Sequence, residues 1–179
     1  YINDYDDKQL GFNQIHGKQL SYNNYSDMFA GLEILNSLKK DSGTVIIKHA
    51  NPCGVSENKI PLISFKNAYA SDPISAFGGV IACNYRINKK IASEISKNFL
   101  EVILANGFDK GSLEILKRKK NLRIIDISNL KFRNLVSIKS FDKSFLIQSK
   151  DNIVINKKKL KCVTKLKPNK KELAEIQFA

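Results

Sequence analysis

Residues 45–55 of the sequence, VIIKHANPCGV, place a lysine and a histidine side by side at the end of an apolar, β-branched run. The run predicts a buried strand, a rigid support that delivers two titratable groups, Lys48 and His49. Neighbouring side chains of a strand point to opposite faces, so these two can serve one site only if the backbone turns at about Lys48. The residues that follow are expected to make that turn, because Asn51 precedes a proline and Gly54 accepts a left-handed conformation.

This turn is expected to lie at a ligand site. Ligands of open α/β sheets bind beyond the carboxyl ends of the strands, and Lys48 and His49 come at such an end. The same two residues can instead be a hydrogen-bonded histidine and a surface lysine whose stem packs on the sheet. The spacing alone leaves both interpretations open.

A second signal comes from residues 71–82, SDPISAFGGVIA. Gly78 and Gly79 directly precede an apolar run, and glycines at the start of a strand indicate that the backbone closely approaches a ligand or another segment. A tight turn explains the same pair without any ligand. We expect the turn after Lys48 to lie near these glycines.

Thiol and metal chemistry are less well supported. His16, His49, Cys53 and Cys83 include zinc-type ligands, but they form neither a C-x-x-C nor an H-x-E pair, so no metal site is expected. A nucleophilic pair of Cys53 and His49 is chemically conceivable, yet four residues across a proline turn give no reason for the two groups to meet. Three widely spaced cysteines favour a reducing compartment over a disulfide framework.

The elements that must position these residues alternate between strand and helix. This alternation predicts an α/β fold of three layers with a mixed, mostly parallel sheet. The strands expected to share the sheet are Val45–Lys48, Val80–Cys83, Val102–Ala105 and Leu122–Asp126.

Helical spacing or capping residues predict the intervening helices. One starts after Ser26 or Asp27 and has lysines in its last turn. The next starts at Pro61 and turns Ile63, Phe65 and Ala70 inward; the third is capped by Asn88, and the fourth covers residues 109–120.

The pattern changes after Ser128. Residues 134–141, 144–149 and 151–156 are short extended runs without helices between them, and a helix is expected after Asn169. We therefore expect an α/β subdomain at 1–128 and a small β extension with the start of a helix at 129–179. The chain starts at Tyr1 and stops inside the last predicted helix, so a fragment truncated at both ends is expected.

Composition bounds the class of protein. No apolar run approaches the ~18 residues that span a bilayer, so a cytoplasmic protein without membrane contact is expected. Much of the net charge of +13 lies in residues 116–120 and 156–161. Either these lysines are solvated surface, or they attract a polyanion; the scarcity of aromatic residues around them favours solvated surface.

Four motifs in the same order resemble a known family. GKQLSYNNYSD, VIIKHANPCGV, SDPISAFGGVIA and LEVILA closely resemble the transformylase part of the bifunctional AICAR transformylase/IMP cyclohydrolase family, from Gly17 to about residue 168. The resemblance implies a cytidine-deaminase-like subdomain without zinc. It also implies formyl transfer from 10-formyltetrahydrofolate to the 5-amino group of AICAR in purine biosynthesis, without a metal. The parent protein is then expected to be a homodimer that also has IMP cyclohydrolase activity.

The resemblance also implies roles for individual residues. His49 matches the family's general base, and Lys48 matches the residue that stabilises charge on the formyl oxygen or the leaving folate nitrogen. Phe77 and Gly78 match the stretch that lies against the nucleotide. Glu101 matches an acidic position that contacts the AICAR heterocycle.

Other motif residues are expected to shape the substrate site rather than take part in chemistry. These are Asn51 and the segment Ser21–Asn24.

One alternative belongs to a different functional class. A deaminase-like module that binds nucleotides or RNA without catalysis would suit the basic balance of the chain. Such a module would depend on residues 116–120 and 156–161, whereas formyl transfer depends on Lys48 and His49. AICAR and the folate are the expected partners, and nucleic acid is not.

Overall fold

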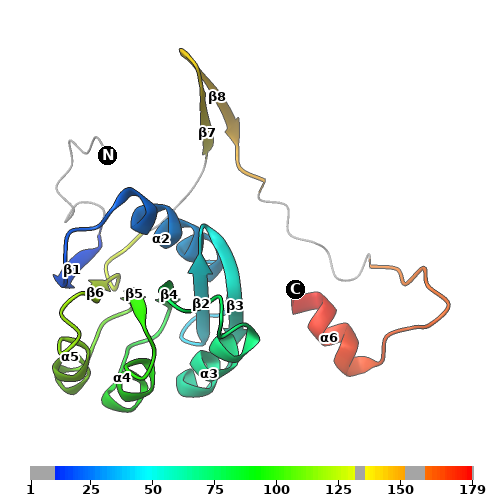
Figure 1. The fold of residues 1–179 in the computed structure, drawn as a ribbon. Helices are drawn as coiled ribbons and strands as arrows, with labels where there is room; N and C mark the ends of the chain where they lie inside the picture. The colour runs from blue at the N-terminus through cyan, green and yellow to red at the C-terminus, as the bar shows by residue number, and fades with distance from the viewer. Residues whose placement is uncertain (1–10, 132–135, 152–159, 179) are drawn as a thin grey trace. The chain divides into compact units, whose positions relative to one another are not determined.

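The computed structural model describes residues 11–131, 136–151 and 160–178 of the chain. The chain divides into two compact units, Tyr1–Arg133 and Asn134–Ala179. The first unit contains a six-stranded sheet with helices packed on it (Figure 1). The predicted α/β fold is therefore confirmed.

The sheet of the first unit has the strand order β1-β6-β5-β4-β2-β3. Its strands are β1 (Asn13–His16), β2 (Gly43–Lys48), β3 (Asn51–Glu57), β4 (Gly79–Cys83), β5 (Leu100–Ala105) and β6 (Arg123–Asp126). The helices are α2 (Tyr22–Leu35), α3 (Pro61–Ser71), α4 (Lys89–Ile95) and α5 (Lys110–Leu116). The four predicted strands share this one sheet, as expected, and β1 and β3 add an unpredicted strand at each edge.

The sheet is mixed, as predicted, but its parallel part is smaller than expected. Parallel pairing joins β4 to β5 and β5 to β6. β2 instead runs antiparallel to both β3 and β4, and β1 runs antiparallel to β6. The two-residue loop after β2 accounts for the pairing of β2 with β3, because so short a connection can only produce a hairpin, in which the strands are antiparallel.

The apolar strands are buried on both faces because helices cover both. Along β2, Ile46 faces the core formed with α3, α4 and α5, whereas Val45 and Ile47 face the core formed with α2. Figure 1 shows α2 on one side of the sheet and the other three helices on the opposite side. This alternation explains the continuous apolar run of the sequence and gives the three expected layers.

Helix α2 begins earlier than predicted. Its N-cap is Ser21, not Ser26 or Asp27: the Ser21 hydroxyl accepts a hydrogen bond from the Asn24 N–H, and the Asn24 side chain accepts one from the Ser21 N–H. This reciprocal capping box binds two N–H groups that the helix would otherwise leave unpaired. The helix ends at Leu35, so the predicted lysines follow it instead of lying in its last turn.

The other helix predictions are largely confirmed. Pro61 occupies the first turn of α3, and the Asn88 side chain caps α4 by accepting from the Ile91 N–H. The predicted inward face of α3 is partly wrong, because Phe65 is buried but Ile63 and Ala70 are exposed.

The second unit contains a hairpin and a helix. Strands β7 (Val136–Phe141) and β8 (Ser144–Ser149) form a two-stranded antiparallel sheet, and α6 covers Lys170–Phe178. The Asn169 side chain caps α6 as predicted, by accepting from the N–H groups of Lys171 and Glu172. The predicted run at 151–156 lies outside the described residues except for Asp151. Across the described part of the chain, no helix has the length and apolarity needed to cross a membrane.

Glycine is required at position 54 for packing and not for a turn. It lies inside β3, and a Cβ atom there would overlap the backbone carbonyl of Ala68 on α3. The missing side chain lets α3 lie directly on the edge strand.

We predict that Gly54→Ala lowers the free energy of unfolding by about 1–3 kcal/mol or more, the usual range for overpacking. Gly111→Ala is the matched control, because a Cβ atom at Gly111 of α5 meets only the Lys89 side chain at 3.5 Å or beyond. Alanine there should be neutral or stabilise by about 0.4–1 kcal/mol. Urea denaturation checks both, and equal effects of the two substitutions would contradict the packing argument.

Candidate functional site

The turn that carries Lys48 and His49 is shorter than predicted. Lys48 ends β2 and pairs with Asn51, the first residue of β3, so the loop consists of His49 and Ala50. Both loop residues have positive φ, 54° and 59°. Gly54 therefore does not supply the left-handed residue, and the segment from Asn51 onward is strand. The edge position of β3 explains how that strand accommodates a proline.

The hairpin and the paired glycines meet at Lys48. Its Nζ donates a hydrogen bond to the Phe77 carbonyl oxygen at 2.8 Å. Gly78 has φ +69°, and a Cβ atom there would lie 3.0 Å from the same Nζ. The glycine thus meets two requirements, the left-handed backbone and the close approach of the lysine, which places the turn near these glycines as expected.

Phe99 contacts both Phe77 and Gly78. Its carbonyl oxygen accepts the Gly78 N–H at 2.9 Å, and its ring centroid lies 4.9 Å from that of Phe77. Both rings remain exposed, Phe77 at 62% and Phe99 at 51%. An exposed aromatic pair beside a lysine offers an apolar surface with a positive charge at its margin.

Glu101 lies in a neighbouring group of polar side chains. The buried Asn24 donates from Nδ2 to Glu101 Oε2 at 3.1 Å, and Arg123 Nη1 lies 3.9 Å from the same oxygen. Arg123 Nε also donates to the Gln19 carbonyl oxygen at 3.1 Å. The segment around residues 17–24 is thereby tied to the starts of β5 and β6.

All these groups lie at the same end of the strands, where β2 finishes and β4, β5 and β6 begin. It is the carboxyl end of β2 but the amino end of β4, β5 and β6, because β2 is antiparallel to β4. The expectation that the site lies at carboxyl ends therefore holds for β2 and fails for the parallel strands. The rule that ligands bind at carboxyl ends holds for parallel strands, and β2 is antiparallel to both of its neighbours.

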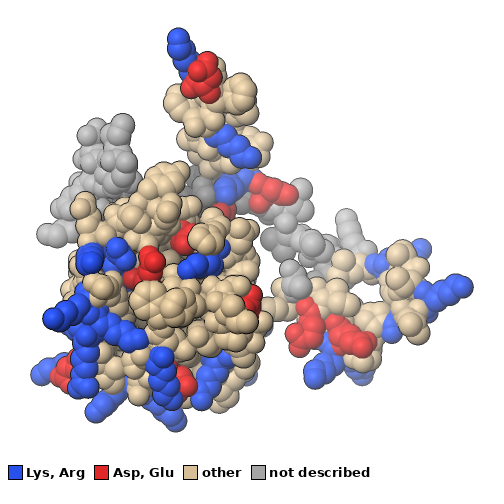
Figure 2. Space-filling model, in the orientation of Figure 1, with Lys and Arg blue, Asp and Glu red and all other residues tan. Residues whose placement is uncertain are grey.

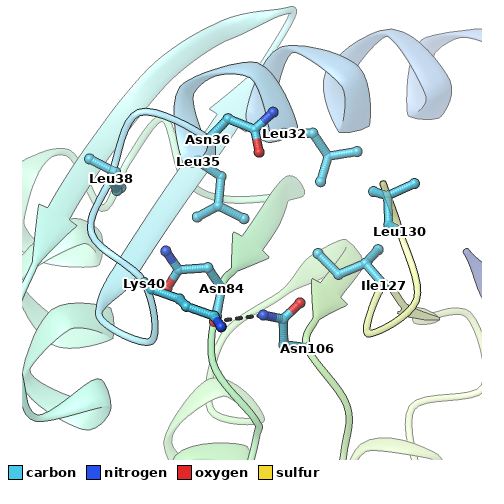
Figure 3. Close-up of a pocket in the computed structure, with 9 residues that line it drawn as sticks. All are labelled: Leu32, Leu35, Asn36, Leu38, Lys40, Asn84, Asn106, Ile127 and Leu130. Atoms are coloured by element: carbon cyan, nitrogen blue, oxygen red, sulfur yellow. Dashed lines mark hydrogen bonds between the residues drawn. The ribbon is translucent and has the colours of Figure 1, made fainter. Parts of the chain in front are cut away.

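A pocket of about 340 Å³ lies at the other end of the strands, where β4 and β5 finish (Figure 3). Asn84 and Asn106, which follow β4 and β5, form part of its wall, and the Asn106 side chain donates to the Asn84 carbonyl oxygen at 2.8 Å. Leu32 and Leu35 of α2 line it too. None of the predicted site residues lines this pocket.

The sequence predicted six site residues, and the structure divides them between two groups of contacts. Lys48 contacts Phe77 and adjoins Gly78, and Asn51 Nδ2 donates to the His49 carbonyl oxygen at 2.9 Å. Glu101 belongs instead to the cluster with Asn24 and Arg123.

Sequence reasoning missed roles for Phe99, Arg123 and Asp27. Arg123 lies inside the predicted strand Leu122–Asp126, and Phe99 lies three residues before the predicted strand Val102–Ala105, so their places in the strand pattern are the signal that could have found them. Asp27 accepts a hydrogen bond from the Ala50 N–H at 2.6 Å, and it was interpreted instead as a helix cap.

Cys53 and Cys83 have the character of structural thiols. Burial raises the pKa of Cys53, whose Sγ donates to the Ile46 carbonyl oxygen, and burial raises the pKa of Cys83 to about 12. Both thiols therefore stay protonated near neutral pH, which does not suit a nucleophile. Among the described residues, no group of three or more His, Cys, Asp or Glu side chains could hold a metal ion.

The basic residues gather elsewhere on the first unit. Figure 2 shows Lys and Arg side chains over the region of α4 and α5. Lys117, Arg118 and Lys120 are exposed there, and Lys119 Nζ donates to the Asn98 carbonyl oxygen. Most of the second basic cluster, 156–161, lies outside the described residues.

The observed contacts define an α/β domain with a lysine–histidine hairpin beside a glycine turn. The sequence profile of the AICARFT/IMPCHase bienzyme family matches residues 1–179. The chain belongs to this family, which confirms the resemblance of the four motifs.

Curated relatives are similar along most of the chain. The bifunctional purine biosynthesis protein PurH of Thermoanaerobacter sp. is 40% identical over 166 residues, 93% of this chain and 32% of the relative. PurH of Elusimicrobium minutum is 41% identical over 172 residues, 96% of this chain and 33% of the relative. The chain thus spans about a third of the length of these relatives. Among solved structures, the apo dCMP deaminase of cyanophage S-TIM5 superposes with a TM-score of 0.41 at 12% identity, over 56% of this chain and 94% of that chain.

The polar cluster around Glu101 predicts a charge-specific effect on stability. Asn24→Asp keeps the capping oxygen but replaces the Nδ2 donor with a second carboxylate facing Glu101. We expect a loss of about 1–3 kcal/mol in unfolding free energy at pH 7, the range for a buried polar group that loses its partner. Urea denaturation measures the loss.

Asn23→Asp is the matched control for this substitution. Asn23 is exposed in the first turn of the same helix, where a negative charge is neutral or mildly stabilising. A similar loss for both substitutions would mean that the Asn24–Glu101 contact is not what matters.

Proposed function

We propose that the protein containing this chain transfers a formyl group from 10-formyltetrahydrofolate to the 5-amino group of AICAR. The observation that carries the proposal is the contact of Lys48 Nζ with the Phe77 carbonyl oxygen, which joins two of the family's motifs at one edge of the sheet. Membership of the bienzyme family supports the reaction class. The same membership supports a second activity, IMP cyclohydrolase, to which we assign no residue of this chain.

His49 is proposed as the general base. The 5-amino group of AICAR is a weak nucleophile, because its lone pair is delocalised into the imidazole and the carboxamide. A base must therefore remove its proton as the nitrogen attacks the formyl carbon, and a neutral imidazole serves this purpose near neutral pH. The exposure of His49 at the tip of a hairpin leaves its ring open to a substrate.

Lys48 is proposed to stabilise the charge that develops in the same step. Attack on the formyl carbon places negative charge on the formyl oxygen, and the folate nitrogen then leaves and takes up a proton. An ammonium group can stabilise the first charge or supply the second proton. The carbonyl of Phe77 holds that ammonium in place through one of its three N–H bonds, which leaves two for the substrate.

The remaining motif residues are proposed to bind AICAR. Phe77 and Gly78 would lie against the nucleotide, and Glu101 would accept hydrogen bonds from the heterocycle. Asn51 shapes the turn through its bond to the His49 carbonyl. We further propose that the protein works in the cytoplasm as a homodimer.

The role of His49 predicts a large effect on rate. In the full-length gene product, His49→Ala should lower kcat for formyl transfer by ~10²–10⁴, the range for general base catalysis, with a much smaller change in KM for AICAR. Steady-state assays measure both constants.

Cys53→Ala is the control for thiol chemistry. Because the Cys53 thiol stays protonated, its removal should leave kcat of the folded enzyme nearly unchanged. A large loss at Cys53 together with a mild effect at His49 would rule out the proposed mechanism.

The role of Lys48 is resolved by two substitutions in the same protein. Lys48→Ala should lower kcat, by up to ~10²–10³ if the lysine acts as an oxyanion donor. Lys48→Arg keeps the charge but holds its proton too tightly to donate it. A largely retained rate with arginine would indicate charge stabilisation, and a rate as low as that of alanine would indicate proton donation. Wild-type rates for both variants would exclude Lys48 from the reaction.

A further inference from the structure

The hairpin turn at His49 and Ala50 has an unfavourable backbone for its sequence. Both residues have positive φ, 54° and 59°. A two-residue turn with two positive φ angles is of type I′, for which Asn-Gly is the preferred sequence. In histidine and alanine the Cβ atom opposes this conformation. Contacts from outside the turn must therefore stabilise it.

Two side chains bind the one peptide group between these residues. Asp27 Oδ1 accepts the Ala50 N–H at 2.6 Å, and Asn51 Nδ2 donates to the His49 carbonyl oxygen at 2.9 Å. That N–H and that C=O belong to the same peptide bond, so both of its polar groups are held. The bond to Asp27 is also assisted by the charge of the carboxylate.

The orientation of this peptide determines the type of turn. Type I′ requires positive φ at both central residues, whereas type II′ requires it only at the first. Exchange between the two types rotates the central peptide, here the one joining His49 to Ala50. A rotation would break both hydrogen bonds and would change the ψ angle of His49, on which the allowed rotamers of the imidazole depend.

Asp27 is itself firmly placed. It lies in α2 three residues after Asn24, so the two side chains lie on the same face of the helix. Asn24 binds Glu101 at the start of β5, while Asp27 binds the hairpin. One helix face thus connects both parts of the candidate site.

We propose that Asp27 is a positioning residue that sets His49 for proton transfer by fixing the turn in its type I′ form. The inference rests on the proposed function, in which His49 is the base. Asp27 acts on the backbone of the turn and does not contact the substrate.

The test uses the full-length gene product and compares single and double variants. Asp27→Ala removes the acceptor and should lower kcat by about tenfold, with little change in KM for AICAR. Asp27→Asn keeps an oxygen that accepts the same N–H, so it should retain most of kcat. Adding Ala50→Gly to Asp27→Ala should restore most of kcat, because glycine adopts positive φ without a Cβ clash.

Asp126→Ala is the matched control. Asp126 accepts a backbone N–H, that of Ser128 at 2.9 Å, but at the opposite edge of the sheet. Its removal should leave kcat unchanged. Urea denaturation of every variant separates loss of stability from loss of rate.

The outcomes distinguish the inference from the proposed function. Wild-type kcat in Asp27→Ala alongside a lowered kcat in His49→Ala would overturn the inference alone. Equal losses in Asp27→Ala and Asp27→Asn, or no recovery with Ala50→Gly, would also overturn it. If Asp27→Ala does not fold, the double variant decides, since near-wild-type kcat supports the inference and a tenfold loss overturns it. Undiminished formyl transfer in His49→Ala would instead overturn the proposed function.

Discussion

The antiparallel pairing of β2 with β4 determines where the candidate site residues of this chain meet. Because β2 runs against β4, its carboxyl end lies beside the amino ends of β4 and β5. Lys48 therefore reaches Phe77, and Glu101 falls at the same edge. A parallel β2 would have delivered Lys48 to the other edge, where the pocket of Figure 3 lies. The assembly of the site thus follows from the direction of a single strand.

Helix α2 connects this edge to the rest of the fold. It approaches the sheet closely at Gly31, where a Cβ atom would lie 3.3 Å from Ile47 and 3.4 Å from Ala82. Its first turns then project to the edge that carries Lys48. There Asn24 uses its carbonyl oxygen in the capping box and its amide nitrogen for Glu101, so one side chain both starts the helix and binds the site. Stability and site geometry consequently share residues in this region.

Local patterns predicted the features that local physics determines. The strands, the capping by Asn88 and the position of Lys48 at a strand end follow from apolar periodicity, capping chemistry and turn composition. The location of the turn did not follow, because Pro52 and Gly54 carry stronger turn signals than His49 and Ala50. The actual turn depends on Asp27, which is 23 residues away in sequence from Ala50. Gly54 was misinterpreted for the same reason, since the segment that requires it is the distant α3.

The hairpin combines a rigid base with an accessible tip. β2 is buried from its first residue to Ile47, and only its last residue and the turn emerge, so His49 is exposed on a support that cannot shift without disturbing the core. Left-handed backbone at two residues with Cβ atoms is a source of strain of the kind found at functional sites, where surrounding contacts must stabilise it. Here those contacts converge on the peptide bond that follows His49. The two contacts therefore restrain the ψ angle of His49, the residue that carries the imidazole.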